Sequence, residues 1–168
     1  GNLVASYAKR ELPNYQVFDE RRYFIPGHEA CVFQVHGVKI GLLNAKSVVE
    51  QPALDALEAG AQMLVVMNAS PFHRGKSSER EQAMQVRSQA TGLPLIYAHL
   101  VGGQDEVVFE GRSFALQANG ELAGRAPSFA DDLFHTSLYF GCLMIGGISG
   151  TCLSPRHRLF VLVLCVVS

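Results

Sequence analysis

Strand-length apolar runs alternate with helical segments through the middle of this chain, and that alternation narrows the possible folds more than any other feature. The runs at residues 38–43, 63–67 and 95–101 are mostly valine, isoleucine, leucine and methionine. Short apolar runs of this kind are typical of strands whose two faces are both covered. A succession of strand, helix, strand, helix and strand predicts an α/β fold with a parallel core.

Two helices are expected between these runs. Pro52 is suited to a first helical turn, because its fixed φ and missing N–H cost nothing there, and Gly60 is a suitable end. Ser78 and Glu81 have the spacing of a capping box, which predicts a second helix over residues 79–91. One face of the first helix would carry Leu54, Leu57 and Ala61.

Antiparallel strands are expected on either side of this core. His36-Gly37 and Asn119-Gly120 are turn sequences, and each joins two short segments of strand character. These segments are residues 29–35 and 38–43 around the first turn, residues 113–117 and 121–123 around the second, and residues 107–109 before them.

The formal net charge of the whole chain is −1, which offers no electrostatic basis for binding nucleic acid or an anionic membrane.

The C-terminal part of the chain differs in composition from the rest. Of the 29 charged side chains, only Arg156 and Arg158 lie in residues 133–168. The apolar run at residues 159–167 is shorter than the roughly 20 residues that a membrane-spanning helix needs. We therefore expect buried strands or an association-prone disordered tail, and no membrane anchor.

Short polar clusters follow the predicted strands, and α/β sheets place their ligand sites at such strand ends. The histidines do not have the spacing of zinc ligands, and the sequence contains no phosphate-binding loop motif. We therefore expect a site without a metal at this edge of the sheet. The polar clusters are residues 9–15, 44–47, 68–76 and 102–106.

Four long strings of this sequence point to a known family: KRELPNYQVFDERRYF, GVKIGLL, ALEAGAQMLVVMNASPFHRGK and HLVGGQDEVVFEGRSFALQANGEL. In this order they resemble the glutaminase domain of glutamine-dependent NAD+ synthetases, a member of the nitrilase (carbon–nitrogen hydrolase) superfamily, over about residues 2–132. The resemblance implies an αββα sandwich in which Glu, Lys and Cys side chains release ammonia from glutamine. A separate synthetase domain then uses the ammonia and ATP to amidate deamido-NAD. We expect residues 1–132 to form a partial carbon–nitrogen hydrolase domain, truncated at its N-terminus, and residues 133–168 to be an apolar tail of unknown origin.

The resemblance also assigns roles to individual residues. Lys9 matches the catalytic lysine, whose ammonium would stabilise the oxyanion of a tetrahedral intermediate; by itself it would be interpreted as an exposed lysine beside Arg10. Tyr15, Ser70 and Lys76 match positions that hold the glutamine substrate. A hydroxyl and an ammonium can bind its α-carboxylate and amino group through charge-assisted hydrogen bonds. From the residues alone, Ser70 would belong to a capped loop and Lys76 would be a solvated charge.

Two departures from the family pattern predict that the chain is inactive. The family nucleophile follows the strand that here reads VKIGLL, in a Cys-Glu-Asp motif, whereas this chain has Asn44, Ala45, Lys46 and Ser47 there. Ala45 therefore occupies the nucleophile position, and a methyl group cannot form a thioester intermediate. The family's general-base glutamate lies in an N-terminal segment, and we expect this chain to begin after it.

Three functional hypotheses are open at this point. The chain is an inactive fragment of a glutamine-dependent NAD+ synthetase, a non-catalytic module that binds glutamine or a similar amide, or an interaction module whose apolar tail is an oligomer contact. The glutaminase domain implies no cofactor, because ATP and deamido-NAD belong to the absent synthetase domain. Expected partners are glutamine, a synthetase domain or subunit and a second copy of the chain, in the cytoplasm. Residues 159–167 could act as a replacement strand that covers an otherwise bare part of the sandwich.

Overall fold

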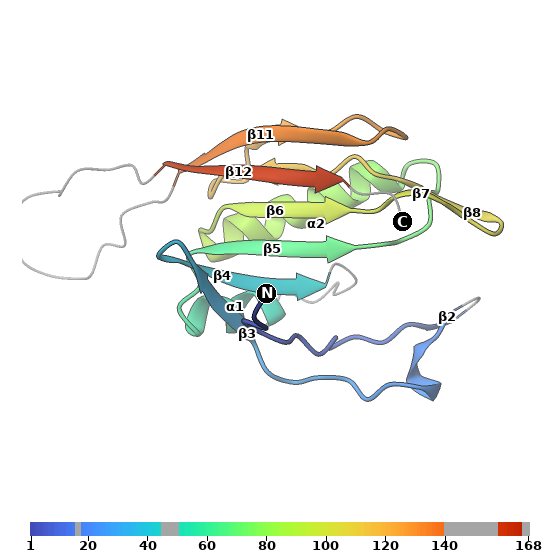
Figure 1. Ribbon diagram of the computed structural model, residues 1–168, viewed down its shortest axis with the longest axis horizontal. Helices are drawn as coiled ribbons and strands as arrows, with labels where there is room; N and C mark the ends of the chain where they lie inside the picture. The colour runs from blue at the N-terminus through green and yellow to red at the C-terminus, as the bar shows by residue number, and fades with distance from the viewer. Residues whose placement is uncertain (16–17, 45–50, 140–157, 166–168) are drawn as a thin grey trace, which may run out of the picture.

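The computed structural model describes residues 1–15, 18–44, 51–139 and 158–165, and its mixed α/β fold confirms the predicted class (Figure 1). These residues form two α-helices, one short 3-10 helix near the N-terminus and twelve strands. In chain order the elements are β1 (Asn14–Tyr15), β2 (Phe18–Asp19), η1 (Glu20–Arg22), β3 (Cys31–Val35), β4 (Val38–Asn44), α1 (Gln51–Glu58), β5 (Met63–Asn68), α2 (Lys76–Thr91), β6 (Leu95–His99), β7 (Val101–Gln104), β8 (Val107–Glu110), β9 (Phe114–Leu116), β10 (Leu122–Arg125), β11 (Asp132–Tyr139) and β12 (Arg158–Cys165).

The central element is a six-stranded sheet with the strand order β10-β9-β6-β5-β4-β3. Its middle strands β4, β5 and β6 run parallel, and α1 and α2 follow β4 and β5 in the chain as the crossover connections. The predicted parallel core is therefore confirmed. β3 and β9 pair antiparallel to the core on either side. Figure 1 shows the arrowheads of β4, β5 and β6 at the same end of the molecule.

Side chains of this sheet alternate between two apolar layers. Leu64 and Val66 of β5 belong to a cluster that includes Met84 of α2. Met63, on the same strand, belongs to a second cluster with Leu138 of β11. All four of the strand residues are almost completely buried. Successive side chains of a strand point to opposite faces, so the helices cover one face of the sheet and β11 covers part of the other.

The strand pair β11–β12 is the cover on this second face (Figure 1). The two strands run antiparallel, from Asp132 opposite Cys165 to Tyr139 opposite Arg158. The apolar tail thus supplies a strand, as its sequence allowed. Together the described residues form three layers of the expected αββα sandwich, a helical layer, a sheet and this strand pair, and they contain no second helical layer. The proposed domain division after residue 132 stays a prediction.

Helix α1 packs closely on β4, at a position where β4 has no side chain. A Cβ atom added to Gly41 would lie 2.9 Å from the Cβ of Ala56 and 3.1 Å from the Cβ of Ala61. Ala53 and Ala56 form the buried centre of the helix face, and the leucines of the predicted face are only partly buried. The predicted face is confirmed only in part, because Leu57 packs against the core and Ala61 is buried. The centre of the face is formed by Ala53 and Ala56 instead, because the glycine permits a helix–sheet distance that only small side chains can fill.

Helix α2 begins three residues earlier than the capping-box spacing predicts. Its first residue is Lys76, and the N-cap is Gly75 in a left-handed conformation without a side-chain capping bond. A tertiary contact anchors this first turn, because the hydroxyl of Ser77 donates to the buried carboxylate of Glu110. In the described parts of the chain, no helix has both the length and the apolar character that crossing a membrane requires.

The predicted strand at residues 95–101 is in fact two strands. β6 ends at His99, and the N–H of Leu100 donates to the carbonyl of Asn68. β7 then pairs with β8 in a separate two-stranded sheet. Figure 1 shows this pair extending from the end of the molecule where the parallel strands finish. Its turn contains Asp105 and Glu106, both exposed, as expected for a solvated turn.

Leu138 tests whether β11 stabilises the fold by covering the second face. We expect Leu138→Ala to lower the free energy of unfolding by about 2–5 kcal/mol, because it empties a fully buried site. The matched control is Leu133→Ala on the same strand, where the side chain is 44% exposed and the expected change is within about 0.5 kcal/mol. Urea unfolding measures both. Equal effects of the two substitutions would contradict the assigned orientation of β11.

Candidate functional site

Polar residues end the three parallel strands and form one edge of the sheet. Asn44, Asn68 and His99 are the last residues of β4, β5 and β6. The strand register sets Asn44 opposite Met67 and Asn68 opposite His99. Because neighbouring strands lie about 4.8 Å apart, these strand ends are adjacent in space. This is the edge at which α/β sheets bind their ligands.

Asn68 connects this edge into a hydrogen-bond network. Its Nδ2 donates to Oγ of Ser70 at 3.1 Å and to the hydroxyl of Tyr97. The N–H of Ser70 donates to Nε2 of His99 at 3.4 Å. Burial raises the pKa of Tyr97 to about 12, so its hydroxyl keeps its proton at neutral pH. The half-buried Ser70 is therefore held through both its backbone and its side chain.

The N-terminal segment that carries Lys9 lies against the end of β4 and against α1. The Tyr7 hydroxyl is hydrogen-bonded to the backbone of Asn44, and burial raises the pKa of that hydroxyl. Arg10 Nη1 lies 2.5 Å from Oδ2 of Asp55 on α1. These contacts on either side of Lys9 fix the segment beside the strand end at which the sequence predicts the reaction centre.

A carboxylate that sequence reasoning did not single out holds Lys9. Lys9 Nζ lies 2.7 Å from Oε1 of Glu20, and the two side chains are 29% and 25% exposed. The backbone supports the pair, because Glu20 N–H donates to the carbonyl of Pro13 and Gly27 N–H to that of Lys9. An ammonium with one donor engaged keeps two for an oxyanion. Glu20 follows Lys9 by eleven positions, a spacing that carries no periodic signal.

The other predicted site residues are placed less completely. Ser70 lies at the strand edge, and Lys76 is exposed at the start of α2, so the loop between β5 and α2 connects them. The backbone of Tyr15 pairs with Phe18 in β1–β2. Ala45, the predicted nucleophile position, lies outside the described residues. Their joint role in holding glutamine therefore stays a prediction. In the described part of the chain, no cluster of three or more His, Cys, Asp or Glu side chains could hold a metal ion.

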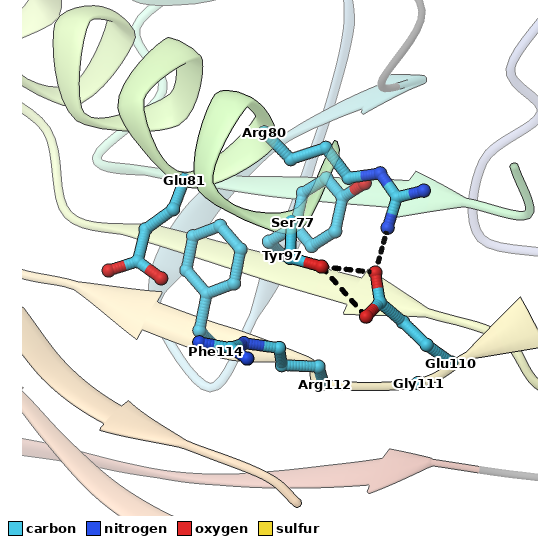
Figure 2. Close-up of a pocket in the computed structure, with 8 residues that line it drawn as sticks. All are labelled: Ser77, Arg80, Glu81, Tyr97, Glu110, Gly111, Arg112 and Phe114. Carbon is cyan, nitrogen blue, oxygen red and sulfur yellow. Dashed lines mark hydrogen bonds and ion pairs between the residues drawn. The ribbon is translucent and has the colours of Figure 1, made fainter. Parts of the chain in front are cut away.

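A second buried polar cluster, which the sequence also did not reveal, lies beneath the first turn of α2. Glu110 is 2% exposed, and both of its carboxylate oxygens lie 2.7 Å from the hydroxyl of Ser77. Nη1 of Arg80 lies 2.5 Å from Oε1 of the same carboxylate. Figure 2 shows Ser77 and Arg80 extending from the helix toward Glu110, whereas Glu81 points away. The cluster borders a cavity of about 10 Å³, which is room for about one water molecule.

His99 makes the stability of this region depend on pH. Burial, with a smaller contribution from the charge of Arg80, lowers the pKa of His99 from 6.5 to about 4. Between these two pH values the unfolded chain binds a proton that the folded chain does not. The folded state therefore loses stability as the pH falls through this window, by roughly 3 kcal/mol in total.

We expect the substitution His99→Gln to remove this component of the pH dependence. Urea unfolding between pH 7 and pH 4 should show the native chain losing stability faster than the variant as the pH falls. The control is His36→Gln, at an exposed turn position, which should follow the native curve. Parallel curves for the native chain and His99→Gln would contradict the assignment.

Comparison with known proteins agrees with this geometry. The sequence model of the family described as carbon-nitrogen hydrolase matches residues 1–139. A glutamine-dependent NAD(+) synthetase of Xylella fastidiosa is 42% identical over 134 residues, which cover 78% of this chain and 25% of that protein. The solved structure of the glutamine-dependent NAD+ synthetase from Acinetobacter baumannii, in complex with ADP, has a TM-score of 0.71 and 38% identity, covering 76% of this chain and 24% of that one. A cysteine-to-alanine mutant of the amidase from Nesterenkonia sp. AN1, in complex with butyramide, has a TM-score of 0.62 and 25% identity over 72% of this chain and 45% of that one.

These comparisons confirm the resemblance to the glutaminase domain of glutamine-dependent NAD+ synthetases and the nitrilase-like fold. The chain spans about a quarter of the length of the synthetases that it matches. The family match extends from the first residue to the end of β11, so it includes Lys9, Glu20 and the whole parallel core. The chain belongs to the carbon–nitrogen hydrolase family.

Proposed function

We propose that this chain is a fragment of the glutaminase domain of a glutamine-dependent NAD+ synthetase. We further propose that it binds glutamine at the polar edge of β4, β5 and β6. The observation that carries the proposal is the 42% identity to such a synthetase over 134 residues. The fold alone is a weaker argument, because one fold supports many substrates and an amidase shares this one. The placement of Ser70 at the strand edge supports the same site.

Each proposed contact has a partner on the glutamine molecule. The ammonium of Lys76 is suited to the α-carboxylate, and the hydroxyls of Tyr15 and Ser70 are suited to the α-amino group and to the carboxylate. The Lys9 ammonium would bind the oxygen of the side-chain amide, where negative charge develops when the carbonyl is attacked. Glu20 supports this role, because its carboxylate holds the ammonium at 2.7 Å.

The proposal does not include hydrolysis of the bound glutamine. The family route needs a thiolate that attacks the amide carbon, expels ammonia and leaves a thioester, which water then cleaves to glutamate. Ala45 offers only a methyl group, so the first bond cannot form. The amidase mutant with alanine in place of a cysteine was solved with butyramide, which supports amide binding without turnover in a fold of this kind.

Other proteins complete the proposed function. A synthetase domain or subunit would bind ATP and deamido-NAD, although this chain itself would supply it with no ammonia, and the ADP in the Acinetobacter baumannii synthetase supports nucleotide binding by such a relative. Leu3, Tyr23, Phe24 and Ile25 are 64–89% exposed, which favours contact with that partner or with a second copy of the chain. We place the protein in the cytoplasm, where ATP and deamido-NAD are found.

Calorimetry with glutamine tests the binding proposal. We expect the native chain to bind glutamine, and Ser70→Ala and Lys76→Ala each to weaken binding by about tenfold through the loss of one charge-assisted hydrogen bond. Ser78→Ala and Lys39→Ala are matched controls at exposed positions and should bind as the native chain does. The absence of binding heat at millimolar glutamine would contradict the proposal.

Position 45 can be tested by restoring a thiol there. We expect the native chain to release no ammonia from glutamine above background, and Ala45→Cys to form one covalent adduct with a glutamine-like chloroketone, because the new sulfur would lie beside the amide carbon. Glutamine in excess should prevent the adduct, as intact mass would show. Ser47→Cys is the control and should not be protected. Ammonia release by the native chain, or unprotected labelling of Ala45→Cys, would refute this part of the proposal.

A further inference from the structure

Arg80 contacts two segments that are distant in the sequence. Its Nη1 pairs with Glu110 at 2.5 Å, and its Nη2 donates to the carbonyl oxygen of Pro71 at 3.2 Å. Glu110 is itself immobilised, because it is buried and both of its oxygens accept the hydroxyl of Ser77. The guanidinium is therefore a bridge between the end of β8 and the loop after β5, and Figure 2 shows its approach to the carboxylate.

The loop that Arg80 holds carries one of the proposed glutamine contacts, Ser70, and leads directly to the other, Lys76. Ser70 directly precedes Pro71, and Lys76 follows at the start of α2. Resting on the glutamine site proposed above, we propose that Arg80 is a positioning residue: by holding the Pro71 carbonyl, it sets where Ser70 and Lys76 lie relative to the strand edge.

This bridge depends on the geometry of a guanidinium. Arginine presents its N–H donors in one rigid plane, so one nitrogen can bind the carboxylate while another binds the carbonyl. A lysine ammonium is a point donor on a flexible stem. It would still neutralise the buried Glu110, which avoids the large cost of an unpaired buried charge. Arg80→Lys therefore separates loop positioning from charge pairing.

Independent contacts hold the loop on its other side, so loss of the bridge would act locally. The N–H of Phe72 donates to the carbonyl of Val108 at 2.8 Å, and its ring packs edge-on against Phe129 with 5.2 Å between the centroids. These contacts keep the loop attached to β8. Without the bridge, the carbonyl of Pro71 would lose its partner. The effect would fall first on the preceding residue, Ser70, whose N–H donates to His99.

Two measurements on the full chain test the role of Arg80. Glutamine affinity by calorimetry and backbone amide exchange by NMR should be compared for the native chain, Arg80→Lys and Arg125→Lys. Arg125 is a matched control, because it pairs with Glu81 of the same helix at 2.6 Å and so joins α2 to β10. We expect Arg80→Lys to weaken glutamine binding by about tenfold, and the amide of Ser70 to exchange faster, whereas the amide of Phe72, which Val108 holds, should exchange as before. Amides of β5 and β6 should exchange as before.

Some outcomes would overturn the positioning role of Arg80, and another would overturn the proposed function instead. Faster exchange throughout the core of Arg80→Lys would show a general loss of stability and would overturn a positioning role, as would unchanged exchange in the loop. Native affinity in Arg80→Lys, or equal weakening in Arg125→Lys, would also overturn it. If the native chain binds no glutamine, the proposed function fails. The exchange data then decide the role of Arg80 alone, with faster exchange confined to the loop supporting it and unchanged exchange refuting it.

Discussion

The parallel pairing of β4, β5 and β6 is the constraint on which the rest of the molecule depends. Parallel neighbours need crossover connections, and here these are α1 and α2 on one face. Both faces of the sheet are apolar, so the opposite face must also be covered, and β11 with its partner β12 does this. The same pairing brings three strand ends to one edge. Core packing and site placement therefore have a common origin.

The polar groups at this edge stabilise one another. Tyr97 stacks on Phe114 with 4.8 Å between the ring centroids and on His99 with 5.8 Å, while its hydroxyl accepts from Asn68. The Arg80 charge lies close enough to lower the pKa values of both Tyr97 and His99. Burial outweighs that effect at Tyr97, so both side chains are neutral at neutral pH. The charged side chains of Lys9 and Arg80 lie to either side of this edge. The carboxylates of Glu20 and Glu110 hold them there.

The sequence predicted those features of the fold that depend on local patterns. Apolar runs located the parallel strands, and the Asn119-Gly120 turn lies between β9 and β10 as expected. The start of α2 was misplaced, because the helix begins after Gly75 without a side-chain cap and a tertiary bond from Ser77 to Glu110 anchors its first turn. Such long-range contacts leave no trace in a local window.

The same limit explains what was missed in the site. Lys9 was found because a long string of residues around it resembles a known family. Glu20 lies in that string as well, but its pairing with Lys9 depends on the path of the loop between them. The bridge between Arg80 and Glu110 joins a helix to a strand end across thirty positions. Burial and geometry identify such residues, whereas spacing does not.

The missing side chain of Gly41 has a mechanical consequence for the reach of Lys9. The contact between β4 and α1 leaves no room for a side chain at Gly41. A single methyl group at this position would approach the Cβ of Ala56 to 2.9 Å and would push the helix outward. Asp55 lies on that helix and forms an ion pair with Arg10, the immediate neighbour of Lys9. Any displacement of the helix would therefore be transmitted along the chain to the ammonium. Gly41, which contacts no ligand, thus helps to determine how accurately the Lys9 ammonium is positioned.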